Sequence, residues 1–395
     1  MINPKMQSLG ARRSSIRELF EYGKKRRAIV GEDQVFDFSL GNPSVPAPDE
    51  VNGELHRLLN TENSVSLHGY TSGEGDISVR QCIANYINEK YEEEVTPECL
   101  YMTVGASAAI TITLKALALE GEEVISVVPC FPEYRVFVEN SGSTFVPVPC
   151  KDDFSLDVEA IRSAINENTA AVMINSPNNP SGVVYSEESI IELSEMMDEM
   201  SKKIGKTIYL ISDEPYRELV YDGAKVPFVT KYYKNTIICY SYSKSLSIPG
   251  ERIGYILVSP RIKDFTDVIS AIRGAGRSLG FVCAPSMLQK LIAGCLGKTA
   301  DISVYDKNRQ LLVASLTEYG YEVTKPQGAF YLFIKSPSGN GVEFSERAKA
   351  MDILIVPSDD FGKSGYARLS YCVDTEMIER ALPKFKKLIE GYKND

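Results

Sequence analysis

The middle of the chain alternates between short apolar runs of strand length and longer segments with helical spacing. This alternation constrains the fold more than any other feature of the sequence. In residues 186–204, for example, apolar side chains recur at the spacing of one helix face. Strands that alternate with helices form a parallel sheet covered by helices. We therefore predict an α/β domain around a mostly parallel sheet, with strands at 123–128, 171–174, 208–212, 236–240 and 253–258.

The pattern changes after about residue 287. A long helical stretch is followed by apolar runs at 329–334, 353–356 and 368–371, which predicts a smaller α+β domain. The turn-forming residues of 41–48 mark the passage from an N-terminal arm into the large domain. We predict three regions: an N-terminal arm with part of the small domain (1–47), a large domain (48–287) and a C-terminal small domain (288–395).

The N-terminal arm contains the basic stretch 12–27, which could be mistaken for a targeting peptide. However, Ser15 and Glu18 have the spacing of a capping box, and Ile16, Leu19 and Phe20 fall on one helical face. We therefore predict a structural helix here.

Composition narrows the functional classes. Lys plus Arg is 43 and Asp plus Glu is 53, so the net charge is −10, which disfavours binding to nucleic acid or anionic membranes. The eight cysteines show no CxxC spacing, as expected for reduced thiols in the cytoplasm. With two histidines, a metal site or a Ser-His-Asp triad is not expected. No apolar run reaches the roughly 20 residues of a membrane span.

Polar residues follow several of the predicted strands. In open α/β sheets, ligands bind beyond the carboxyl ends of the strands. An amide-rich turn follows the run 171–174, an acid and a tyrosine follow 208–212, and a lysine among small hydroxyls follows 236–240. In chain order, these candidates are Asn179, Asp213, Tyr216, Ser241, Ser243, Lys244 and Arg252.

Each of these residues alone is common in loops, but the set matches what a pyridoxal phosphate (PLP) site needs. A lysine can form an imine with the cofactor, and a carboxylate can pair with its pyridinium nitrogen. Hydroxyls, amides and an arginine can bind its phosphate and its phenolic oxygen.

From about residue 41 to residue 368, the chain resembles the PLP-dependent class I/II aminotransferases of fold type I. That fold implies a large α/β/α PLP-binding domain, here 48–287, and a smaller α+β domain. It also implies an L-α-amino acid and a 2-oxo acid as substrates. The resemblance rests on the segments Gly41-Asn42-Pro43, Tyr70, Gly105-Ala106-Ser107, Asn179-Pro180-Ser181-Gly182, Asp213-Glu214-Pro215-Tyr216, Ser241-Tyr242-Ser243-Lys244 with Arg252, and Arg368-Leu369-Ser370.

The resemblance implies roles for the residues that contact the cofactor ring. Lys244 would form the Schiff base and move the proton between the substrate Cα and C4′. Asp213 would pair with the pyridinium nitrogen. Tyr216 and Asn179 would hydrogen-bond the phenolic oxygen, and Phe131 would stack on the ring.

The resemblance also implies how the phosphate and the substrate are bound. Ala106 and Ser107, at a helix N-terminus, would bind the phosphate together with Ser241 and Arg252. Tyr70 would reach the phosphate of a partner subunit, which implies a homodimer with shared sites. On the substrate side, Arg368 would bind the α-carboxylate through two parallel hydrogen bonds, beside Gly41 and Asn179.

One position departs from some aspartate-specific relatives, which carry a lysine where this chain has Ser107. That route to a second substrate carboxylate is absent, so the donor amino acid stays open. Other arginines could replace that lysine: Arg12, Arg13, Arg17, Arg273 and Arg277.

Two alternative functions stay open at this point. A carbon–sulfur lyase or a decarboxylase on the same fold would begin its reaction in the same way. An aminotransferase-like ligand sensor would carry a DNA-binding domain, but only about forty residues precede Gly41. Amino transfer is the function we expect.

Overall fold

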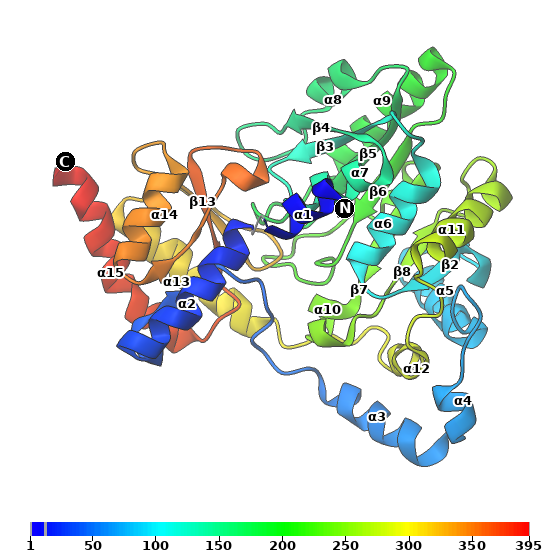
Figure 1. Ribbon diagram of the computed structural model, residues 1–395, viewed down its shortest axis with the longest axis horizontal. Coiled ribbons are helices and arrows are strands. Elements are labelled where there is room, and N and C mark those ends of the chain that lie inside the picture. Colours follow the sequence, from blue (N-terminus) through cyan, green and yellow to red (C-terminus); the bar gives the residue numbers. More distant parts are fainter. Residues whose placement is uncertain (1, 12–13, 395) are drawn as a thin grey trace. The chain divides into compact units, whose positions relative to one another are not determined.

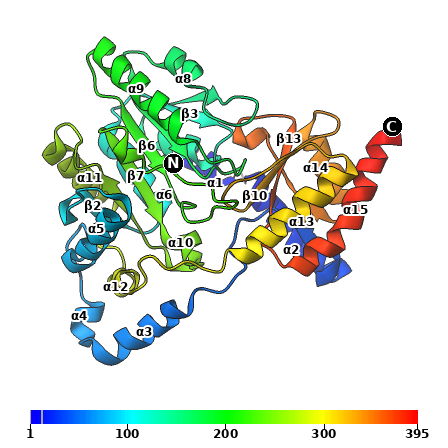
Figure 2. The ribbon, with the colours of Figure 1, turned by 180° about the vertical axis from the view of Figure 1, so that it is seen from behind.

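The computed structural model describes residues 2–11 and 14–394, which group into two compact units (Figures 1 and 2). Among the described residues, unit 1 contains 2–11, 14–44, 179–182 and 303–394, and unit 2 contains 45–178 and 183–302. The first division falls inside the turn-rich segment 41–48. The domain boundaries that we predict after residues 47 and 287 stay predictions.

Unit 2 is built on a sheet with the strand order β2-β8-β7-β6-β5-β3-β4, seven strands within the described residues (Figure 1). Strand β8 runs antiparallel to both neighbours, and the other pairs are parallel. This confirms the mostly parallel sheet. The strands are β2 (Leu100–Thr103), β3 (Glu123–Val128), β4 (Thr144–Pro149), β5 (Thr169–Asn175), β6 (Tyr209–Asp213), β7 (Thr236–Ser241) and β8 (Gly254–Val258).

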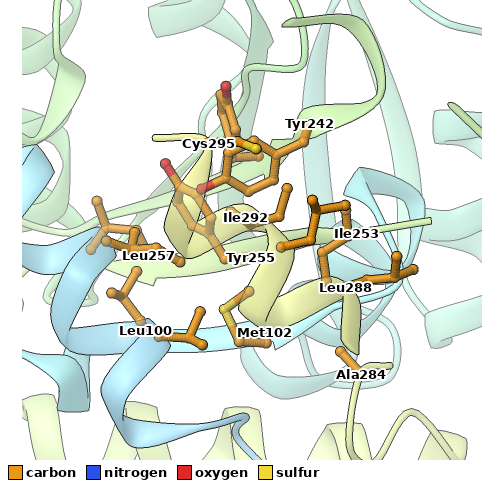
Figure 3. Packing of buried hydrophobic residues seen from close by; sticks show 14 of the residues in the cluster. Leu100, Met102, Tyr242, Ile253, Tyr255, Leu257, Ala284, Leu288, Ile292 and Cys295 are labelled. Carbon is orange, nitrogen blue, oxygen red and sulfur yellow. The ribbon is translucent and has the colours of Figure 1, made fainter. Parts of the chain in front are cut away.

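Helices cover both faces of this sheet because successive side chains of each strand point to opposite faces. Ile237 and Cys239 belong to a cluster with α6 and α11, whereas Ile238 and Tyr240 pack with α5 and α12. Figure 3 shows part of the second cluster. The helices of unit 2 are α3 (Asp49–Thr61), α4 (Ser64–His68), α5 (Ile77–Tyr91), α6 (Ala106–Leu117), α7 (Glu133–Ser141), α8 (Val158–Ala164), α9 (Glu187–Ile204), α10 (Tyr242–Ser245), α11 (Phe265–Leu279) and α12 (Ser286–Gly294), with 3-10 turns at Pro97–Cys99, Val229–Lys231 and Pro249–Glu251.

Unit 1 contains a four-stranded antiparallel sheet, counted over the described residues, in the order β12-β13-β10-β9. A separate parallel pair joins β1, near the N-terminus, to β11. The strands of unit 1 are β1 (Phe36–Asp37), β9 (Val323–Thr324), β10 (Tyr331–Lys335), β11 (Ile353–Leu354), β12 (Val356–Pro357) and β13 (Tyr366–Ser370). Its helices are α1 (Pro4–Ala11), α2 (Ser15–Val30), α13 (Ser303–Tyr319), α14 (Gly341–Ala350) and α15 (Thr375–Asn394), with 3-10 turns at Glu32–Gln34 and Asp359–Phe361.

The predicted N-terminal helix is present as α2, but its predicted capping box is wrong. Ser14 is the N-cap residue and makes no side-chain cap. The backbone N–H of Ser15 instead donates to Asp360 Oδ2 at 3.3 Å, so a residue distant in sequence satisfies this helix end. Leu19 is buried in a cluster on which Ile16 packs, as the predicted face requires.

No helix in residues 2–11 and 14–394 has the length and hydropathy to cross a membrane. Over the same residues, no group of three or more His, Cys, Asp or Glu side chains is placed to bind a metal ion. All eight cysteines are free thiols.

Candidate active site

Asp213 ends strand β6, and its carboxylate is buried. The hydroxyl of Tyr134 donates a hydrogen bond to Oδ2. The side-chain amide of Asn175 donates to the backbone oxygen of Asp213 at 2.9 Å and so fixes the strand end. The other carboxylate oxygen, Oδ1, is buried and has no hydrogen-bond partner among the residues that the structure describes. A buried acceptor without a donor is costly, so Oδ1 marks the place of a missing donor.

The electrostatics of Asp213 point to the same conclusion. Burial raises its pKa to about 7, the hydrogen bond from Tyr134 lowers it, and the nearby charge of Glu214 raises it. A cationic N–H donor beside Oδ1 would stabilise the ionised carboxylate. The pyridinium nitrogen of PLP is such a donor, so the buried carboxylate fits this cofactor.

Tyr134, whose hydroxyl donates to Asp213, is a candidate site residue that the sequence motifs do not indicate. It lies in the first turn of α7, three residues after Phe131, which was itself a candidate. The Phe131 ring is half-buried and meets the Tyr134 ring edge-on, with the centroids 5.7 Å apart. The spacing from Phe131 was the only available signal, because the bond to Asp213 links residues far apart in sequence.

We expect Tyr134→Phe to raise the pKa of Asp213, because the substitution removes a hydrogen bond that favours the carboxylate. A hydrogen bond to a charged group contributes about 1.5–3 kcal/mol, so kcat should fall roughly tenfold to a hundredfold. The acid limb of the pH–rate profile should move to higher pH. Tyr185→Phe is the matched control, since Tyr185 is equally buried in the same unit. An unmoved acid limb in Tyr134→Phe would contradict this positioning role.

Helix α6 and Arg252 together form a candidate anion site. Gly105 precedes α6 with a φ of 89°, a conformation that favours glycine. The Arg252 guanidinium lies so close that a Cβ on Gly105 would be 2.5 Å from its Nη2 atom. The structure thus places a guanidinium beside the N–H groups at the start of a twelve-residue helix, an arrangement that binds phosphate.

Two serines extend this anion site. The Ser241 hydroxyl caps α10 by accepting from the N–H of Ser243 at 3.2 Å, and the two hydroxyls lie 2.8 Å apart. Arg252 Nη1 donates to Ser243 Oγ at 3.2 Å. Ser243, a candidate to which the sequence assigns no role, therefore belongs to the network. Ser107 is exposed in the first turn of α6.

Lys244 and Tyr216 lie beyond the carboxyl ends of neighbouring strands. Strands β6 and β7 are parallel, with Asp213 opposite Cys239, so the residues that follow them meet at one sheet edge. Lys244 belongs to α10 directly after β7 and is half-buried. Tyr216 follows β6 and is buried.

Arg368 organises the candidate substrate site of unit 1. It lies on β13 and is only 2% exposed. Its Nη1 donates to Asn179 Oδ1 at 3.1 Å, and its Nη2 donates to the backbone oxygen of Ser39 at 2.5 Å. The guanidinium lies over the rings of Tyr331 and Phe361, at 4.5 and 5.1 Å from their centroids. These contacts hold the planar group in one orientation, as recognition of a carboxylate requires.

Gly41 lies in the same part of unit 1. A Cβ at this position would be 2.1 Å from the Tyr331 hydroxyl, so a side chain here would displace the ring over Arg368. The structure thus brings together the three predicted substrate-side residues of unit 1, Gly41, Asn179 and Arg368.

Four other candidates, Arg17, Tyr70, Arg273 and Arg277, are exposed. Tyr70 is fully exposed in the connection between α4 and α5. Arg273 is occupied by an ion pair with Glu74 at 2.5 Å. Arg17 and Arg277 are exposed, and the remaining candidates, Arg12 and Arg13, lie outside the described residues.

The sequence profile of the family described as aminotransferase class I and II matches residues 33–385. The chain belongs to this family. A probable aspartate/prephenate aminotransferase of Thermus aquaticus is 32% identical over 358 residues, covering 89% of this chain and 91% of the relative. An aspartate aminotransferase of Thermotoga maritima is 30% identical over 385 residues, covering 95% and 97%.

A solved structure extends the comparison. The crystal structure of an amino transferase from Eubacterium rectale matches with a TM-score of 0.98 and 52% identity, covering 99% of both chains. The predicted family, fold type, enzyme class and PLP cofactor are confirmed. This aminotransferase is therefore a PLP-dependent enzyme, and the relatives described above carry aminotransferase names rather than those of lyases.

Proposed function

We propose that this aminotransferase moves the amino group of an L-α-amino acid to a 2-oxo acid, with Lys244 as the cofactor-binding lysine. The buried Oδ1 of Asp213, which lacks a donor, carries the proposal because a pyridinium N–H would complete its hydrogen bonding. When bound, PLP supplies an electron sink for the charge that develops on the substrate Cα.

The residues of the chain would share the remaining tasks. Lys244 would hold the cofactor covalently and then carry a proton from and back to the substrate. Asp213 would keep the ring nitrogen protonated, with Tyr134 keeping the carboxylate ionised. Tyr216 and Asn179 would donate to the phenolic oxygen. The contacts with the ring face and the phosphate are assigned to Phe131, Ala106, Ser107, Ser241, Ser243 and Arg252.

Arg368 would bind the α-carboxylate shared by all donors and acceptors. Arg368→Lys should therefore raise KM by a similar factor for every amino acid, since an ammonium group cannot form two parallel hydrogen bonds. We expect kcat/KM to fall by about tenfold to a hundredfold, or roughly 1.4–2.7 kcal/mol. Steady-state kinetics with several donors test this, and a loss confined to one donor would contradict the role.

We expect that no lysine or arginine of this enzyme is dedicated to binding the side chain of the amino-acid donor. Ser107 carries no charge, and Arg273 is already paired with Glu74. The decisive experiment compares kcat/KM for aspartate, alanine and phenylalanine with 2-oxoglutarate as acceptor. A preference for aspartate above about a thousandfold, roughly 4 kcal/mol, would show that a cationic side chain binds the second carboxylate of the substrate. It would contradict our expectation that the enzyme accepts a broad range of donors. Release of ammonia or CO₂ without amino exchange would favour the lyase or decarboxylase instead.

A homodimer with shared sites is the assembly we propose. Tyr70 is fully exposed, as are most of the Val65 and nearly half of the Val282 side chains. Gly73 and Val282 lie close together, so the Tyr70 segment and the end of α11 offer apolar surface to a partner.

Mixing a Tyr70→Phe variant with Lys244→Ala should form heterodimers with one intact site. Activity should recover to about a quarter of the parent value, because half of the random dimers are mixed and each has one of two sites intact. Activity measured during subunit exchange tests this. Mixing either variant with itself is the control, and exchange without recovery would contradict shared sites.

We also propose a cytoplasmic location and a role in amino-acid metabolism. The eight free thiols favour a reducing compartment. Thiol titration of protein from freshly lysed cells, before and after reduction, tests this location.

A further inference from the structure

Unit 2 contains a cavity of about 40 Å³ that the proposed chemistry does not use. Helix α10 links it to the active-site region, because Tyr242 and Ser245 line the cavity on either side of Lys244 in sequence. Exposed residues, including Lys90 and Lys298, connect it to solvent. The remaining lining comes from the end of α5, the segments 217–228 and 295–299, and strands β7 and β8.

Two tyrosines of this cavity pack through their rings, on each other and on Tyr240, rather than through their hydroxyls. Tyr242 and Tyr255 are 6% and 7% exposed, and neither hydroxyl forms a hydrogen bond with any residue that the structure describes. Both rings lie beside Cys295 at one side of the apolar cluster (Figure 3). Because both tyrosines line the cavity, their hydroxyls can hydrogen-bond a molecule that is bound in it.

The charged groups of the cavity are of two kinds. Arg217 is ion-paired with Glu214, and Lys298 with Glu50. Lys90 and Glu218, in contrast, form no ion pair with any described residue. The cavity therefore offers one cation and one anion that attract each other over a longer distance without forming a direct ion pair among the described residues.

The Lys90 ammonium and the Glu218 carboxylate each form hydrogen bonds with tyrosine hydroxyls. The Lys90 ammonium donates to the Tyr86 hydroxyl at 2.8 Å and is exposed. Glu218 is half-buried and accepts from the Tyr240 hydroxyl at 2.9 Å, and that hydroxyl lies 3.1 Å from Ser245 Oγ. Burial raises the pKa of Glu218, and the nearby charges of Arg217 and Lys90 offset only part of this rise, so a ligand ammonium beside the carboxylate would stabilise its ionised form further.

We propose that this cavity binds a small zwitterion, an amino acid of the size of glycine or alanine. Its ammonium group would pair with Glu218 among the tyrosine rings, and its carboxylate would pair with Lys90. A simple anion would be repelled by Glu218, and a simple cation by Lys90. A water needs about 10–15 Å³ of such volume, so the cavity has room for about three waters or one glycine-sized molecule.

The test measures glycine binding by calorimetry on borohydride-treated holoenzyme, in which the lysine–cofactor linkage can no longer exchange with amino acids. Lys90→Met and Glu218→Gln each remove one charge, while Lys298→Met is the matched control because Lys298 already pairs with Glu50. Acetate and methylammonium, each carrying one of the two charges, serve as reference probes. Crystals soaked in glycine give a second, independent measurement.

We expect glycine to bind more tightly than either reference probe. Each charge-removing variant should weaken binding at least about tenfold, or roughly 1.4 kcal/mol, and the control by less than about twofold. Unchanged affinity in both variants, the absence of binding heat, or water alone in the cavity of soaked crystals would each overturn the proposal. The proposed function would be contradicted by a different result, the absence of a pyridoxyl label on Lys244 after borohydride reduction. The two proposals can therefore be tested separately.

Discussion

Lys244→Ala is expected to lower kcat by more than about a thousandfold, or roughly 4 kcal/mol. The substitution removes both the covalent anchor of the cofactor and the group that moves the proton at the substrate Cα. PLP should still bind without a covalent bond, because Arg252 and the N-terminus of α6 are unchanged. Activity assays and absorbance spectra of the purified variant measure the two effects separately.

Borohydride reduction followed by peptide mapping locates the lysine that binds the cofactor. The parent enzyme should carry the pyridoxyl label on Lys244, and the variant should carry none. Lys115→Ala is the control, because this lysine is exposed on α6 in the same unit and should leave both labelling and kcat unchanged. A label on any other lysine would refute the assignment.

The sheet could be predicted from the sequence because its strands are almost completely buried. Strand β3 occupies the predicted residues 123–128, since a buried strand appears as an uninterrupted apolar run. The start of α2 was harder to predict, because the backbone of Ser15 is satisfied by Asp360 of a distant segment. A capping pattern gives information only about neighbours in sequence.

The same limit applies to the candidate site. Asp213 could be predicted because it ends a strand, which is where α/β sheets bind ligands. Tyr134 could not, because its hydroxyl reaches Asp213 only after β3 and β6 take their places in the sheet. The ion pair that occupies Arg273 likewise joins α11 to a segment far earlier in the chain. Residue type identified the candidates, whereas their partners depend on tertiary packing.

Asp213→Asn is expected to lower kcat by more than about a hundredfold, roughly 2.7 kcal/mol, with a smaller effect on PLP affinity. Asparagine is neutral and cannot stabilise a protonated ring nitrogen, so the loss falls mainly on the transition state. The contacts to the cofactor phosphate are retained, which preserves binding. Steady-state kinetics and PLP titration measure the two quantities. A kcat within about threefold of the parent, roughly 0.7 kcal/mol, would show that Asp213 does not pair with the ring nitrogen.

The same substitution should stabilise the cofactor-free protein. Burial raises the pKa of Asp213 from 3.8 to about 7, so between these values the folded protein keeps a proton that the unfolded chain has released. The contribution of Asp213 to stability therefore falls as the pH rises through this window. Because asparagine cannot ionise, the free energy of unfolding of Asp213→Asn should exceed that of the parent by roughly 2–4 kcal/mol at about pH 8. The difference should shrink to less than about half at pH 5, as measured by urea unfolding of both apoproteins. An equal difference at both pH values would mean that Asp213 does not titrate in this range, and its buried carboxylate would then not be the cause of the stability change.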